Sequence, residues 1–87
     1  MQRDALTRRL ATLARAGILT GGWLQKYTVR RHDEEFACPC CGEPCWTGDT
    51  AWIAFDEHGE ESYEPACSQS CLVQTLENRA TYYAKGA

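Results

Sequence analysis

Residues 38–42 read Cys-Pro-Cys-Cys-Gly, and residues 67–71 read Cys-Ser-Gln-Ser-Cys. In the first stretch, Cys38 and Cys41 have the Cys-x-x-Cys spacing of a metal-binding knuckle, in which two thiolates converge within one tight turn. The proline fixes one backbone torsion, and Gly42 accepts the left-handed conformation that such a turn needs. This stretch therefore predicts half of a metal site.

The second stretch lies where a helix is expected to begin. A thiolate in a first helical turn is favoured by the positive end of the helix dipole, and Ser68 is suited to cap the helix. Two such pairs, separated by strand-like sequence, are typical of a closed tetrahedral site with four sulfur ligands. We predict one zinc ion per chain, bound by Cys38, Cys41, Cys67 and Cys71.

Two cysteines remain outside this set. Cys40 should point away from the metal, because its neighbour Cys41 points inward. Cys45 suits a buried apolar position, and it is also an alternative ligand that could replace one of the four. A second site built from these two cysteines with His32 and His58 has no supporting spacing. An iron–sulfur cluster and a redox Cys-x-x-Cys remain weaker alternatives for the main motif.

Size and composition favour one small domain spanning residues 1–87. Chains of 87 residues bury a small core and often add a metal to become stable. No apolar run has the length of a membrane span, and residues 1–4 lack the apolar core of a signal peptide. We therefore expect a cytoplasmic protein with no membrane association, in which thiols stay reduced and bind metal rather than form disulfides.

Charge divides the chain into two parts. Residues 1–31, a basic N-terminal helix and first strand, carry seven basic residues against Asp4 alone. Residues 32–87, the acidic zinc module, carry eleven acids against Arg79 and Lys85. Because phosphate contacts require cations, the zinc module should repel nucleic acid. The basic part could dock on the acidic part of its own chain. It could also dock on the acidic part of a second copy, and the two chains would then form a homodimer.

Hydrophobic periodicity predicts a small α+β fold. The leucines at positions 6, 10 and 13 form one stripe of a helix over residues 2–16, and Gly17 follows its end. Strand-like alternation covers residues 23–31, and a turn at 32–33 would return the chain along 34–37. Residues 51–55 and 62–65 should form a hairpin around a polar turn. A second helix is expected over 68–84, with Gly86 past its end.

This arrangement of a knuckle, a β-hairpin and a cysteine pair at a helix start resembles the treble-clef class of zinc fingers. Within it, the ligand pattern with Gly42 and Ser68 is similar to the short YacG-type proteins and the TRASH- and MYM-like fingers, over about residues 38–76. The hairpin here looks longer, and the first thirty or so residues have no counterpart. The resemblance implies a bacterial or phage protein that inhibits a nucleic-acid-handling enzyme, since YacG-type proteins bind and inhibit DNA gyrase.

We expect a non-catalytic protein, because four cysteines close the zinc shell and no catalytic motif is present. A protein–protein interaction module or regulator is the leading hypothesis, since tryptophan and tyrosine are favoured at interfaces. The candidate contact residues are Trp46, Trp52, Tyr63, Tyr82 and Tyr83, although Trp52 and Tyr63 could instead simply cover the hairpin. The alternative is nucleic-acid binding through Arg8, Arg9 and Arg15.

Overall fold

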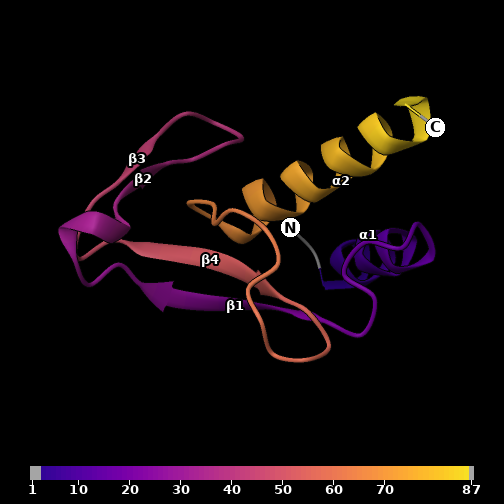
Figure 1. The fold of residues 1–87 in the computed structure, drawn as a ribbon, viewed down its shortest axis with the longest axis horizontal. Coiled ribbons are helices and arrows are strands. Elements are labelled where there is room, and N and C mark those ends of the chain that lie inside the picture. Colours follow the sequence, from indigo (N-terminus) through magenta and orange to yellow (C-terminus); the bar gives the residue numbers. More distant parts are fainter. Residues whose placement is uncertain (1–2, 87) are drawn as a thin grey trace.

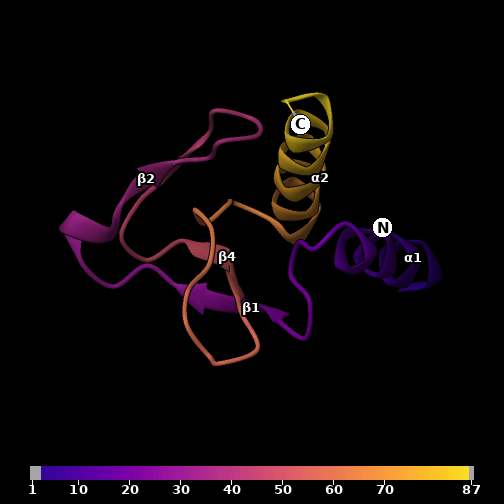
Figure 2. The ribbon, with the colours of Figure 1, turned by 45° about the vertical axis from the view of Figure 1, so that its right-hand side comes forward.

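The computed structural model describes the backbone of residues 3–86 and the side chains of residues 5–81. It is a small α+β structure in which two helices lie on one side and a short hairpin lies at the opposite end (Figures 1 and 2). The elements in chain order are α1 (Arg3–Arg15), β1 (Trp23–Thr28), a 3-10 turn η1 (His32–Glu34), β2 (Phe36–Ala37), β3 (Pro44–Cys45), β4 (Thr50–Phe55) and α2 (Gln69–Gly86).

Helix α1 confirms the predicted leucine stripe and the predicted end at Gly17. All three leucines pack in the main core, where Leu13 is 2% exposed. The Gly17 N–H donates to the Ala14 carbonyl (3.0 Å), and the Ile18 N–H donates to the Leu13 carbonyl (2.9 Å). This pair of bonds, with Gly17 at a φ of 82°, is a Schellman motif. Buried Ile18 completes it by packing with Leu13.

The main sheet consists of β1 and β4, which pair antiparallel from Trp23 opposite Phe55 to Thr28 opposite Thr50. The prediction that residues 23–31 would fold back on residues 34–37 is therefore wrong. The chain turns through η1 instead, because Glu34 accepts hydrogen bonds from the Arg31 side chain (3.0 Å) and the Arg30 N–H (3.4 Å). Such local hydrogen bonds of a carboxylate stabilise the turn and compete with the backbone hydrogen bonds that would continue the strand.

The short strands β2 and β3 form a separate hairpin that carries the knuckle. Phe36 lies opposite Cys45, and Ala37 lies opposite Pro44. Glu35, expected in a strand, lies just outside it and accepts the Thr47 N–H (2.7 Å). That hydrogen bond lowers the pKa of Glu35 and ties the start of the hairpin to the loop that follows it.

The return segment after β4, residues 61–66, pairs with β4 only at isolated points, so the predicted hairpin is confirmed only in part. Trp52 and Ala66 exchange two backbone hydrogen bonds of 2.8 and 2.9 Å, and the Ser62 N–H donates to the Ala54 carbonyl (3.0 Å). From Trp52 to Ala54, β4 covers two residue steps, whereas the return segment covers four steps from Ala66 back to Ser62. The extra residues include Pro65, which has no N–H to donate and so interrupts the ladder.

Two apolar clusters form the core. The larger one joins α1, β4 and α2 through the fully buried Leu72, Val73 and Leu76 of α2. The smaller one lies under the β2–β3 hairpin and contains Val29, Cys45 and Ala51. Cys67 packs against both clusters, which places the start of α2 at their junction. Helix α2 continues through Gly86, two residues beyond its predicted end, and no helix in the described part of the chain could cross a membrane.

Candidate metal centre

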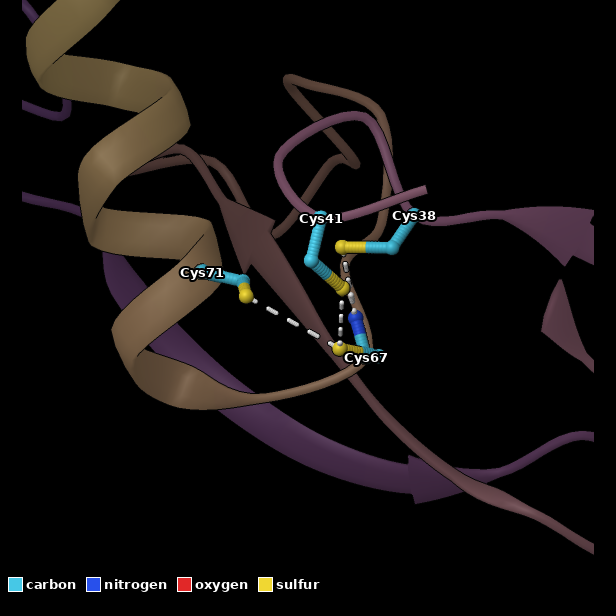
Figure 3. A group of neighbouring side chains, drawn as sticks. All are labelled: Cys38, Cys41, Cys67 and Cys71. Atoms are coloured by element: carbon cyan, nitrogen blue, oxygen red, sulfur yellow. Dashed lines mark hydrogen bonds between the residues drawn. The ribbon is translucent and has the colours of Figure 1, made fainter. Parts of the chain in front are cut away.

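The knuckle between β2 and β3 has the backbone that its sequence predicts. The Gly42 N–H donates to the Cys38 carbonyl (2.9 Å), and the Cys38 N–H donates to the Glu43 carbonyl (2.9 Å). Gly42 has a φ of 78°, a left-handed conformation that other residues adopt only with strain. This closed turn brings Cys38 and Cys41 onto one side (Figure 3).

The other two thiols come from the start of α2. The Ser68 hydroxyl accepts the Cys71 N–H (3.1 Å), and the Leu72 N–H donates to the Ser68 carbonyl (3.0 Å). Ser68 therefore caps the helix as predicted. Cys67 precedes the cap and Cys71 lies in the first turn, so both sulfurs face the knuckle (Figure 3).

The four predicted ligands form a single cluster. Their sulfur atoms all lie within 4.8 Å of one another, with 3.4 Å between Cys41 and Cys67 and 3.8 Å between Cys67 and Cys71. A tetrahedral zinc site with Zn–S bonds of about 2.3 Å has sulfur atoms about 3.8 Å apart. The cluster therefore has the size and the chemistry to hold a metal ion such as zinc. No other group of this kind is found in the described part of the chain, including around His32 and His58.

The electrostatics of the cluster differ between its members. Burial alone would raise the pKa of the Cys38 thiol, but N–H groups of Cys67, Cys41 and Cys40 donate to its sulfur and bring the pKa down to about 6. The N–H of Cys67 lies 3.5 Å from that sulfur. Burial and the neighbouring thiols raise the pKa of Cys67. Backbone hydrogen bonds therefore stabilise the thiolate form of Cys38, whereas Cys67 needs a bound cation to stabilise its thiolate.

The two remaining cysteines have different surroundings. Cys45 is 3% exposed and packs with Val29 and Ala51, and burial raises the pKa of its thiol. It is not part of the four-sulfur cluster, so this structure does not use it as the alternative ligand. Cys40 is exposed, and its pKa is raised first by a hydrogen bond with the thiol of Cys71. Like Cys45, it is not part of the four-sulfur cluster.

One of the three arginines proposed for nucleic acid is paired within the protein itself. Arg9 makes a double hydrogen bond to the Glu77 carboxylate of α2, with Nε to Oε2 at 2.8 Å and Nη2 to Oε1 at 2.5 Å. Arg8 and Arg15 are exposed, and Arg15 contacts the Thr12 hydroxyl at 3.4 Å. The middle arginine of the set therefore helps to dock α1 on α2.

Two of the five aromatic residues proposed for partner binding pack against the core. Trp52 and Tyr63 are half-buried and pack against the main cluster, and the guanidinium of Arg79 lies 5.2 Å from the centre of the Tyr63 ring. Tyr82 and Tyr83 have side chains outside the described residues. Among the described residues, the exposed large hydrophobic side chains are Trp46 (58%), which is one of the proposed contact residues, and Trp23 (43%).

Trp23, which was not among the predicted contact residues, lies on the surface. Its ring stacks on Phe55 with centroids 5.3 Å apart. The alternation of β1 puts Trp23 on the same face as Gln25, but only the pairing of β1 with β4 brings Phe55 beside it.

Comparison of the chain with family models, with curated proteins and with solved structures gave no match. The cysteine cluster itself is therefore the main guide to function.

Proposed function

We propose that this chain is a non-catalytic zinc protein of the treble-clef type that acts by binding another protein. The observation that carries this proposal is the four-sulfur cluster, which joins a knuckle to the start of a helix. Four thiolates complete the tetrahedral shell of zinc and leave no position for a substrate or an activated water. The metal then has a structural role, and function lies on the surface that it stabilises.

The charge distribution supports a protein partner over nucleic acid. No lysine or arginine occurs between His32 and Asn78, so the zinc module offers phosphate groups only the two cations of α2, Arg79 and Lys85, against eleven acids. On α1, Arg9 is neutralised by Glu77, which leaves Arg8 and Arg15 as the exposed members of the proposed set. An acidic surface of this kind attracts a basic protein surface. A regulator of a nucleic-acid-handling enzyme, as the YacG-type resemblance implies, fits this charge.

Native mass spectrometry of the purified protein tests both parts of the proposal. We expect one zinc per chain and no adduct with a short DNA duplex at low salt. A duplex adduct that disappears at high salt would replace the proposal with nucleic-acid binding through Arg8 and Arg15. A chain that folds without metal would refute the structural role of zinc.

Ligand variants identify the site. Cys71→Ser should lose zinc, whereas Cys40→Ser is the matched control and should keep it. Because Cys40 lies in the same knuckle as Cys38 and Cys41, the double variant of Cys71 and Cys40 removes the substitute ligand that is nearest to them in sequence. Full zinc content in the double variant would show that the ligand set is wrong.

A further inference from the structure

The face of the β1–β4 sheet that points away from α2 carries a hollow of about 490 Å³. Residues at alternate positions of a strand share a face, and Trp52 and Ala54 of β4 pack toward α2. The opposite positions form the floor of the hollow, and the return segment forms one wall. These residues are Gln25, Tyr27, Ile53, Phe55, Glu61 and Pro65.

The hollow is acidic. Its second wall contains Arg31, but that guanidinium is already paired with Glu34 at 3.0 Å and with Asp33 at 3.4 Å. Glu61 is exposed and has no ion pair among the described residues. Burial raises the pKa of Tyr27, and the nearby charges of Cys45, Glu34 and Glu61 add to this rise.

The floor also offers aromatic rings to a cation. Tyr27 and Phe55 line the hollow, and the exposed Trp23 extends this surface by stacking on Phe55. Arginine is suited to such a place, because its planar and weakly hydrated guanidinium stacks on rings while it pairs with a carboxylate. The chain already contains this kind of contact elsewhere, where Arg79 lies over the ring of Tyr63.

Strand β1 adds a reason to expect an extended segment. Within the described residues β1 pairs only with β4, so its other edge is open beside the hollow. An extended peptide can add main-chain hydrogen bonds at such an edge and place alternate side chains on one face of the sheet.

We propose that this hollow binds an arginine of an extended basic segment in the partner protein, with the guanidinium over Phe55 and against Glu61, which lie opposite each other in an isolated bridge. The inference rests on the proposed function, since it names the surface and the kind of partner. The acidic rim would repel a phosphate group, so a nucleic acid is a poor occupant.

The test is an NMR titration of the zinc-loaded, full-length protein with the peptide acetyl-Gly-Arg-Val-Arg-Gly-amide. We expect amide shifts concentrated on Gln25, Tyr27, Ile53 and Glu61. The same peptide with citrulline in place of arginine keeps the shape but loses the charge, and it should not bind. Glu61→Gln should lower the affinity for the arginine peptide by about threefold, as expected for the loss of a solvent-exposed ion pair. Glu60→Gln is the matched control, because Glu60 does not line the hollow, and it should leave the affinity unchanged.

Other outcomes would overturn the assignment. Shifts outside the hollow, equal binding of the citrulline peptide, or no binding at millimolar peptide would each reject it. Shifts of the hollow that depend on protein concentration without peptide would show that a second copy of the chain is the occupant. A parallel titration with a short DNA duplex separates the two proposals. If the peptide does not bind and the duplex binds α1, the proposed function is wrong as well. If neither the peptide nor the duplex binds, only the assignment of the hollow is wrong.

Discussion

The ion pair between Arg9 and Glu77 should contribute measurably to stability, because it joins the first and the last helix. The two residues are 68 positions apart in sequence, and their side chains are 29% and 32% exposed. Exposed ion pairs contribute about 0.2–1 kcal/mol. Hydrogen bonds to charged groups contribute about 1.5–3 kcal/mol. This double bond is partly shielded from water, so we expect a coupling free energy of about 1–1.5 kcal/mol between these limits.

A double-mutant cycle with Arg9→Ala and Glu77→Ala measures this coupling. Unfolding should be followed by circular dichroism in guanidinium chloride with zinc present, so that metal loss does not distort the free energies. For a domain of this size, 1 kcal/mol corresponds to a decrease of about 4–8 °C in Tm. Arg8→Ala is the matched control, since Arg8 is exposed, and it should change stability little. A coupling near zero would refute the argument that this pair docks α1.

The pH dependence provides an independent check. The hydrogen bond from Arg9 lowers the pKa of Glu77 from its ordinary value of 4.5. A depressed folded-state pKa contributes stability that is fully present above the unfolded value and is lost as the pH falls through the folded value. The stability difference between the wild type and Glu77→Gln should therefore shrink as the pH drops below about 4.5. A difference that grows toward acid would contradict the sign of this shift.

Three further changes test the core and the metal centre. Cys45→Ala should keep one zinc per chain by mass spectrometry, because Cys45 lies outside the cluster; loss of zinc would make it a ligand after all. Gly22→Ala should lower the free energy of unfolding by about 1–3 kcal/mol or more, since its Cβ would lie 2.1 Å from the Phe55 carbonyl oxygen. Chelation of zinc should remove hydrogen-exchange protection from the Gly42 amide before it affects α1. Simultaneous loss in both places would mean that the metal stabilises the whole chain as one unit.

Local signals made much of this structure predictable. The cysteine spacing identified all four members of the cluster, because a knuckle and a helix start each fix their ligands within five residues. The leucine stripe and Gly17 located α1 because its side chains repeat with the helical period and its cap is local. These features depend on neighbours in sequence, which is why they could be derived without the fold.

The features that the sequence did not predict are contacts between segments that are far apart in the chain. Nothing local indicates that β1 pairs with β4 instead of with the residues that follow it, and the Arg9–Glu77 pair is equally remote.

The position of the cluster connects metal binding to the proposed binding surface. The β2–β3 hairpin pairs through two residue pairs only, and a hairpin of that size is not stable alone. A bound zinc would join it to α2 at Cys67, the residue that packs against both core clusters. The return segment that forms one wall of the hollow, with Glu61 and Pro65, leads directly into Cys67. The metal would thus hold that wall in place, and its four thiolates would outweigh the charge of zinc and make the module more acidic. Loading with zinc should therefore favour both the shape and the charge that a basic partner requires.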